Sequence, residues 1–453
     1  MRRGLFSDGD FYIKLRRLGI PIAMQNLMLA AVAAGDAIML GRVTQNSMAA
    51  VSLATQIQFV QNMILSAVVS AGAILGAQYW GRRDTRTIND LFLMMLRLSG
   101  IPSLLFCLGC VLAPQALMLV FTHDPDLMAI GAGYLRIAGW SYLLTGISHC
   151  FLAVMKVTDH AGTTAWVSSL AVVLNILLNA VFIFGLFGLP AMGAKGAALA
   201  TLLSRAIELG LCLWLSRQPG YVAPDFSRIA RRDPLLSRDF RRVCLPLLGG
   251  GLFWGVGFTA YTAIMGHMGA DAAASNSIAA VVRDLVCCLN MGVATAGGIM
   301  VGNELGAGDL ERGRLYGDRL AKLSFLIGLL STAIVLAVTP LVVRFIHLTP
   351  EARQYLTGMM VIMSVYMIGR CVNTVIINGI FGAGGDTMFD VYSLAVSMWG
   401  IAIPLALLGA FALHWPVLAV YACTCLDEVG KIPWVMVHYR KYRWVRDLTR
   451  ERE

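Results

Sequence analysis

The chain has 453 residues, of which 58% are hydrophobic and only 14% are charged, and its mean hydropathy is +0.71. A soluble domain carries about a quarter charged residues, so this composition excludes an ordinary water-soluble protein and indicates that much of the surface faces lipid. The net charge of +10 does not indicate a nucleic-acid partner, because the Lys and Arg residues lie mainly between apolar runs and at the chain ends.

Twelve apolar stretches of about 20 residues or more, the length that crosses the hydrocarbon region of a bilayer, predict an all-α polytopic membrane protein with twelve transmembrane helices. A charged segment without the apolar core of a cleavable signal precedes the first stretch, so we expect that stretch to be retained. In chain order the predicted spans are residues 15–40, 52–78, 90–112, 127–151, 163–188, 193–216, 243–267, 276–302, 315–340, 355–380, 389–412 and 416–438.

The positions of Lys and Arg predict how these spans are oriented. Basic residues gather before the first span, after spans two and eight, in the linker 217–242 and after the last span. The other side carries Arg42, Lys195, Arg344 and Arg353. Since basic loops stay on the cytoplasmic side, both termini and the linker are predicted to be cytoplasmic in a protein of the inner (plasma) membrane.

The two halves of the sequence match at a fixed offset of 225 residues, without a gap across the first two spans of each half. An even number of spans per half gives both halves the same direction. This predicts two six-helix bundles related by pseudo-two-fold symmetry, an architecture suited to alternating access. The predicted domains are an N-terminal bundle at 1–216, a basic cytoplasmic linker at 217–242, a C-terminal bundle at 243–440 and a basic cytoplasmic tail at 441–453. Matched pairs include Pro21 with Pro246, Gly81 with Gly306, Asp84 with Asp309, and Pro125 with Pro350.

The segment after span two distinguishes between families with this number of spans. The stretch GAQYWGRRD at 76–84 does not match the major facilitator pattern G-x-x-x-D-R-x-G-R-R. An amide three residues before a glycine, at Gln78 and Gly81 and again at Asn303 and Gly306, resembles instead the multidrug and toxic compound extrusion (MATE) family. Four further stretches resemble that family in the expected order: GDAIMLGR at 35–42, NILLNAVFIFG at 175–185, MGAKGAALAT at 192–201 and FGAGGDT at 381–387.

The resemblance implies a secondary active exporter that exchanges inward protons or sodium ions for outward drugs or metabolites, often amphipathic and cationic. The implied partners are small-molecule substrates and the lipid bilayer; we expect a monomer without a cofactor and without enzymatic activity. The sequence has no G-x-x-x-x-G-K-[ST] motif, which argues against an ATP-driven pump. The alternative is a flippase or exporter of lipid-linked or polar metabolites in the same superfamily.

Asp36 is a carboxylate in the first apolar run, where a charge costs several kcal/mol unless it is paired, hydrated or neutralised. In the MATE family the acid at this position couples the ion, and the resemblance places a hydroxyl ligand at Thr201. Asn175 and Asn179 are four residues apart and share a helix face. Such oxygen ligands suit a hard cation, but a single carboxylate favours a proton over a sodium ion at Asp36. The alternative interpretations are an Asp36–Arg42 pair and purely structural hydrogen bonds of the two amides.

Further charges interrupt the second half. Arg283 and Asp284 in span eight and Arg370 in span ten either form an Arg–Asp pair that locks these helices together or line the substrate cavity. Trp254 and Met265 are candidate cavity residues. We expect no other metal site and no disulfide, because the ten cysteines lie in or beside apolar runs. Local ion pairs are predicted for Glu428 with Lys431 and Arg205 with Glu208, and membrane-interface anchors at Trp415, Trp434 and Trp444.

Overall fold

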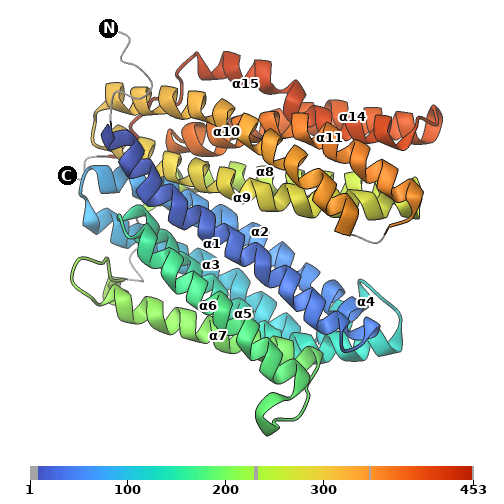
Figure 1. Cartoon of the computed structure of the whole chain (residues 1–453). Coiled ribbons are helices and arrows are strands. Elements are labelled where there is room, and N and C mark those ends of the chain that lie inside the picture. The colour runs from blue at the N-terminus through green and yellow to red at the C-terminus, as the bar shows by residue number, and fades with distance from the viewer. Residues whose placement is uncertain (1–8, 229–232, 346–347, 451–453) are drawn as a thin grey trace. The chain divides into compact units, whose positions relative to one another are not determined.

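The computed structural model describes residues 9–228, 233–345 and 348–450, except for the side chains of residues 31, 33–38, 41 and 45. Every regular element over these residues is a helix (Figure 1). The helices of the first half are α1 (Gly9–Gly41), α2 (Gln45–Gly81), α3 (Thr85–Leu112), α4 (Pro114–Leu119), α5 (Pro125–Val157), α6 (Ala161–Phe184) and α7 (Ala194–Ser216), with short 3-10 turns at Leu186–Gly188 and Phe226–Arg228.

The second half follows the same course and adds π-helical turns. Its helices are α8 (Pro234–His267), α9 (Ala270–Gly306), α10 (Leu310–Phe345), α11 (Pro350–Asn373), α12 (Met388–Leu394), α13 (Ile403–Leu407), α14 (Val417–Gly430) and α15 (Ile432–Tyr439). The π-helical stretches Thr374–Phe381, Ala395–Ala402 and Leu408–Ala412 continue α11, join α12 to α13 and extend α13. The tenth and eleventh predicted spans are therefore each one long helix with widened turns.

Ten helical stretches in the described part of the chain are long and apolar enough to cross a membrane. They cover the second to the eleventh predicted span. α1 covers the first predicted span, and α14 with α15, which meet at Lys431, covers the twelfth. The element order thus agrees with twelve spans.

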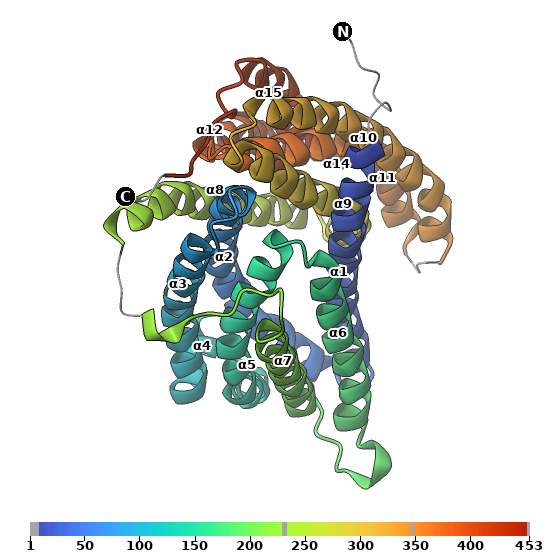
Figure 2. The same ribbon diagram turned by 90° about the vertical axis from the view of Figure 1, so that its left-hand side faces the viewer.

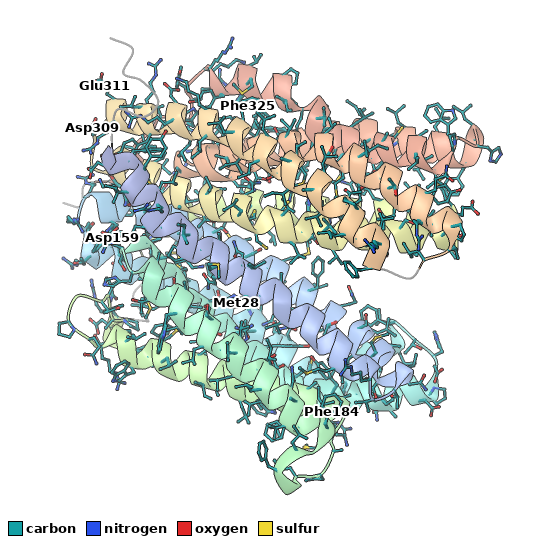
Figure 3. All side chains as sticks on the ribbon, viewed as in Figure 1. Met28, Asp159, Phe184, Asp309, Glu311 and Phe325 are labelled. Carbon is teal, nitrogen blue, oxygen red and sulfur yellow. The ribbon has the colours of Figure 1, made fainter. Side chains whose placement is uncertain are left out.

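Capping side chains fix the starts of the third helix in each half. The Asp84 carboxylate accepts a hydrogen bond from the Thr87 backbone N–H at 3.0 Å, and Asp309 accepts one from the Arg312 N–H at 2.9 Å. Figure 3 labels Asp309 at the start of α10. These caps satisfy N–H groups that a helix leaves open in its first turn. The repeated Asp of the sequence is thereby explained as a repeated helix start. Asp124 and Thr349, also 225 residues apart, cap α5 and α11 in the same way.

The chain divides into two compact units by its internal contacts. Unit 1 comprises Met1–Ala23, Ala77–Arg82 and Leu245–Glu453, and unit 2 comprises Met24–Gly76 and Arg83–Cys244. Helices α1, α2 and α8 therefore each pass from one unit into the other without interruption. The domain boundaries predicted from sequence stay a prediction.

Unit 2 is built around α5, which packs against α3, α6 and α7; Figure 2 shows α5 and α7 side by side. Its polar side chains bond across helices: Gln61 on α2 is 0% exposed and donates to the Ser103 hydroxyl at 3.1 Å and the Tyr142 carbonyl at 2.9 Å. Such bonds satisfy polar groups in an apolar bundle, where a lone group would be costly.

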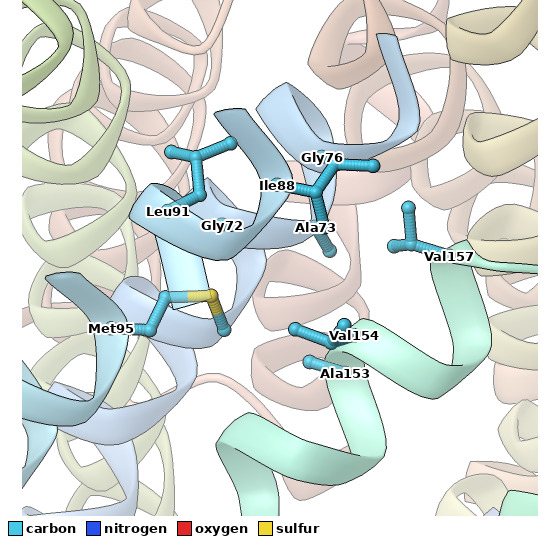
Figure 4. A pocket seen from close by; sticks show the side chains of 9 residues that line it. All are labelled: Gly72, Ala73, Gly76, Ile88, Leu91, Met95, Ala153, Val154 and Val157. Carbon is cyan, nitrogen blue, oxygen red and sulfur yellow. The ribbon is translucent and has the colours of Figure 1, made fainter. Parts of the chain in front are cut away.

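A small apolar pocket lies in unit 2 between α2, α3 and α5 (Figure 4). Gly72 and Gly76 form its α2 wall, with Met95 on α3 and Val157 on α5 opposite. A Cβ atom at Gly72 would meet the Met95 sulfur at 2.1 Å, whereas one at Gly76 would meet Val157 at an ordinary 3.5 Å. Small residues one turn apart let these helices approach closely, as is typical of membrane bundles.

Unit 1 is built around α9 and α11. α9 packs against α10, α11 and the π-helical stretch Thr374–Phe381, and α11 also contacts α14. α8 is held to the π-helical stretch Ala395–Ala402, where the Trp399 indole N–H donates to the Phe253 carbonyl at 3.1 Å. Met265 on α8 is 1% exposed and belongs to the buried core.

Candidate functional site

The polar residues predicted in spans five and six come together in unit 2. Asn179 Nδ2 donates to Asn175 Oδ1 at 3.2 Å, and Asn175 Nδ2 donates to the Thr201 hydroxyl at 3.2 Å. Asn179 is 0% exposed and Asn175 is 5% exposed. The Thr201 hydroxyl in turn donates to the Ala197 carbonyl at 3.0 Å. A chain of hydrogen bonds therefore links α6 to α7, and whether the two amides serve only this structural role or also hold an ion stays a prediction.

Asp36, the predicted coupling acid, belongs to α1. Its side chain lies outside the described residues, so its distance to the amides and its pairing with Arg42 both stay predictions. Arg42 itself follows the last turn of α1 and is exposed.

The charged residues of the second half pair differently from the prediction. Arg283 bonds to its own neighbour on α9, with Nη2 at 2.8 Å and Nε at 3.0 Å from the Asp284 carboxylate. Arg370 on α11 donates through Nη1 to Glu428 on α14 at 2.8 Å. Of the two alternatives for these residues, the Arg–Asp lock between spans eight and ten is therefore wrong, and the cavity-lining role stays a prediction. The Asp284 side chain is 65% exposed and is taken up by Arg283, while Arg370 is held by a carboxylate of span twelve.

Glu428 is the centre of a buried polar network in unit 1. Its carboxylate lies 3.1 Å from Lys431 Nζ and accepts a 2.7 Å hydrogen bond from Asn373 Nδ2, besides the bond from Arg370. The side chains of Glu428 and Lys431 are 3% and 4% exposed. The predicted local pair Glu428–Lys431 is thus confirmed. Sequence spacing missed Arg370 and Asn373 as partners, because no local pattern relates span ten to span twelve.

Two aromatic rings of α8 lie against the arginines of this unit. The rings of Trp254 and Phe258 stack with centroids 5.3 Å apart. The Arg370 guanidinium carbon is 5.9 Å from the Trp254 ring, and that of Arg283 is 4.3 Å from the Phe258 ring. A cation–π contact of this kind attracts the guanidinium to the face of the ring, and the attraction is stronger where little water surrounds the charge. That Trp254 and Met265 line a substrate cavity stays a prediction.

A second predicted ion pair and one predicted anchor have clear outcomes. Arg205 and Glu208 form an ion pair on α7, and Glu208 is 0% exposed, which confirms the local pairing. Trp415 and Trp434 are partly exposed, at 37% and 38%, but Trp444 is 0% exposed. The prediction that Trp444 anchors the protein at the membrane interface is wrong, because its ring packs against α10 at Gly317.

The amide–glycine motifs meet at the ends of α2 and α9, within unit 1. A Cβ atom on Gly81 would lie 2.0 Å from the Asn303 backbone carbonyl oxygen, and one on Gly306 would lie 1.9 Å from the Gln78 carbonyl oxygen. Each motif thus supplies a glycine for the backbone of the other. Only a residue without a side chain permits this approach.

Metal chemistry has no support from residue clusters. The described residues contain no group of three or more His, Cys, Asp and Glu side chains that could hold a metal ion. All ten cysteines are free thiols. What the chain provides instead is a set of buried amides, hydroxyls and ion pairs within apolar helices.

The MatE family model matches residues 21–181 and 246–408. The two matched segments begin at Pro21 and Pro246, the same offset as the internal repeat.

Full-length relatives support this assignment. The chain is 23% identical to an uncharacterized transporter, YisQ, of Bacillus subtilis, over 97% of this chain and 96% of that one. It is 26% identical to the multidrug resistance protein NorM of Burkholderia vietnamiensis, over 88% of each chain. It is 25% identical to a probable multidrug resistance protein NorM of Bradyrhizobium diazoefficiens, over 89% of this chain and 87% of that one.

Solved structures confirm the fold. A mutant of the Vibrio cholerae MATE transporter VcmN aligns with a TM-score of 0.87 at 16% identity, over 96% of this chain and 98% of the other. A MOP superfamily transporter from Pyrococcus furiosus aligns with a TM-score of 0.86 at 18% identity, over 96% of each chain. The predicted all-α fold with twelve spans in two bundles is confirmed, and so is the prediction of a transporter and not an enzyme. The chain belongs to the MatE family of multi-pass membrane transporters, the multidrug and toxic compound extrusion family that its motifs resemble.

Proposed function

We propose that this protein is a secondary active multidrug exporter. Inward movement of protons, or of sodium ions, drives amphipathic and often cationic compounds outward by alternating access. Relatives named multidrug resistance protein NorM support export of such compounds. We further propose that it works as a monomer in the inner (plasma) membrane with both termini in the cytoplasm, as the distribution of Lys and Arg favours.

The observation that carries the proposal is the buried chain of hydrogen bonds from Asn179 through Asn175 to Thr201. These side chains offer amide and hydroxyl oxygens on two largely apolar helices. Asp36 lies in the GDAIMLGR stretch of α1, and we propose that its carboxylate completes this group as the coupling acid. A buried carboxyl binds a proton more readily than one in water, so its charge can follow the access state.

The chemistry of the proposed site favours a proton as the coupling ion. A sodium ion prefers several oxygen ligands with sufficient negative charge, and this group offers one carboxylate. In the second half, we propose that Arg283, Asp284, Arg370, Trp254 and Met265 contribute to the substrate cavity. The stacked pair Trp254–Phe258 supplies a flat apolar face of the kind that amphipathic compounds bind.

The test is ethidium transport in inverted vesicles, driven in turn by a proton gradient and by a sodium gradient. Asp36→Asn removes the titratable group and keeps the side-chain volume, so we expect at least a tenfold loss of ethidium transport with normal amounts of protein in the membrane. The matched control is Asp126→Asn, which removes an exposed carboxylate from the first turn of α5. Undiminished transport by Asp36→Asn, or transport that responds to neither gradient, would contradict the proposal.

A further inference from the structure

The segment that follows α15 is docked at several points on the rest of unit 1. We call residues 440–449 the C-terminal strap. Trp444 at its centre is 0% exposed and fills the space above Gly317 of α10, and its ring stacks on Tyr439 with centroids 5.8 Å apart. Burial of this ring removes a large apolar surface from water and so stabilises the contact. The strap is therefore a docked segment and not a loose tail.

Polar contacts fasten the end of α15 and the first part of the strap, before Trp444, to α10. The hydroxyls of Tyr439 and Tyr442 both donate to the Asp318 carboxylate. The Arg314 guanidinium lies 3.8 Å from the centre of the Tyr442 ring. These groups come from α10, from the last residue of α15 and from the strap, so the first half of the strap holds to one helix.

The other half of the strap holds the end of α2. Gln78 is 0% exposed, and its side chain bonds only to backbone groups among the contacts that the structure gives. Its Nε2 donates to the Ala383 carbonyl at 2.7 Å and to the Arg446 carbonyl at 3.2 Å, while its Oε1 accepts from the Leu448 N–H at 2.6 Å. One turn further on, Arg82 donates to the Thr449 hydroxyl at 2.7 Å. One buried amide thus joins α2 to the strap and to the FGAGGDT stretch.

The strap binds α2 close to the point where this helix passes from unit 2 into unit 1. Residues Ala77–Arg82 belong to unit 1, whereas Met24–Gly76, which includes the rest of α2, belongs to unit 2. α2 is one continuous helix of 37 residues that runs from unit 2 into unit 1. The strap holds that end beside α9 at the Gly81–Gly306 contact.

We propose that the C-terminal strap is a latch on the transport cycle. Bound to Gln78 and Arg82, it holds the ends of α2 and α9 together and so stabilises the conformation that is closed on the side of the C-terminus. Opening on that side requires the strap to release α2. This inference rests on the proposed alternating-access export, in which opposite sides open in turn.

Chemical cross-linking tests the latch. In a background in which Cys244 and Cys288, the cysteines that are not fully buried, are replaced by Ser, a flexible bis-maleimide joins Arg82→Cys to Thr449→Cys. We expect this bridge to reduce ethidium transport at least tenfold relative to the same variant before cross-linking. The matched control joins Arg314→Cys to Tyr442→Cys, which bridges the strap to α10, and should leave the transport rate within about twofold. Transport that survives the first bridge, or equal inhibition by both bridges, would overturn the proposal.

A labelling measurement keeps the latch testable even without transport. Gln78→Ala removes the bonds that hold the strap to α2, so maleimide should label Thr449→Cys about tenfold faster. The control Asn62→Ala removes an exposed amide from the same helix and should not change the rate. An unchanged rate in Gln78→Ala would overturn the latch. Absence of ethidium transport in the parent protein would refute the proposed function, while this labelling arm would still decide on the latch.

Discussion

The crossing of α2 and α9 gives the sharpest prediction about stability. In Gly306→Ala the new Cβ would lie 1.9 Å from the Gln78 carbonyl oxygen, whereas Cβ atoms essentially never come closer than 3.0 Å to another heavy atom. The two helix ends must therefore move apart by about 1 Å or more. The obstacle is backbone, which cannot rotate away as a side chain can. Overpacking of this kind costs about 1–3 kcal/mol.

The matched control is Gly100→Ala on α3, where a Cβ atom would meet nothing within 4 Å. Alanine is the better helix former by about 1 kcal/mol, so this variant should be at least as stable as the parent. We expect the two variants to differ by about 2–4 kcal/mol, measured as loss of monodisperse protein after heating in detergent. Gly81→Ala, which meets the Asn303 carbonyl oxygen at 2.0 Å, should behave like Gly306→Ala. The double variant should cost less than the sum, because one separation relieves both clashes. If Gly306→Ala proved as stable as Gly100→Ala, the close crossing would be refuted.

Two further changes test the packing of each unit by the same heating assay. Glu428→Gln leaves Arg370 and Lys431 without their buried carboxylate, so we expect the free energy of unfolding to fall by about 3–5 kcal/mol. The control Asp284→Asn changes a side chain that is 65% exposed and should cost less than about 1 kcal/mol. Equal effects of the two variants would contradict the buried network. Gly76→Ala places a Cβ at ordinary contact distance from Val157 beside the apolar pocket, so it should raise the free energy of unfolding by about 0.5–1 kcal/mol. Gly72→Ala must displace Met95 and should be the less stable of the two. The reverse order of stability would contradict the packing of α2 against α3 and α5.

The fold was predictable because hydropathy, charge and the repeat are all written along the sequence. Apolar runs long enough to cross a bilayer predict helices, and the pairs at an offset of 225 residues predict two related halves. The structure adds the reason for part of that repeat. Asp84 and Asp309 both cap the third helix of their half, so the same residue type marks the same helix start in each half.

The pairing of buried charges was only partly predictable. Glu428 with Lys431 and Arg205 with Glu208 are three residues apart on one helix, and this spacing brings side chains together wherever the helix lies. The partner of Arg370 is set by the packing of α11 against α14, which no local spacing encodes. The alternative of an Arg–Asp lock between spans eight and ten fails because Asp284 pairs with its sequence neighbour Arg283.

Trp444 shows a similar limit. A tryptophan in a basic segment after the last span is typical of a membrane-interface anchor, and Trp444 was predicted to be one on this ground. The prediction fails for Trp444 because Gly317, a residue far away in the sequence, leaves room for the ring on α10. Hydropathy records that a ring avoids water, but it does not distinguish between a lipid and a protein partner.

The contact between α2 and α9 also shows where the two halves stop being equivalent. Gly81 and Gly306 play the same part, since each accommodates the backbone of the other motif, as in a two-fold interface. The amides of the two motifs, Gln78 and Asn303, have different hydrogen-bond partners. Gln78 bonds to the strap and to Ala383, whereas Asn303 Oδ1 has no hydrogen-bond partner among the described residues. The strap, which follows the second half in the sequence, bonds to the amide of the first half. The repeat thus explains why α2 and α9 cross symmetrically at Gly81 and Gly306, whereas the strap binds only the α2 side of this contact, at Gln78.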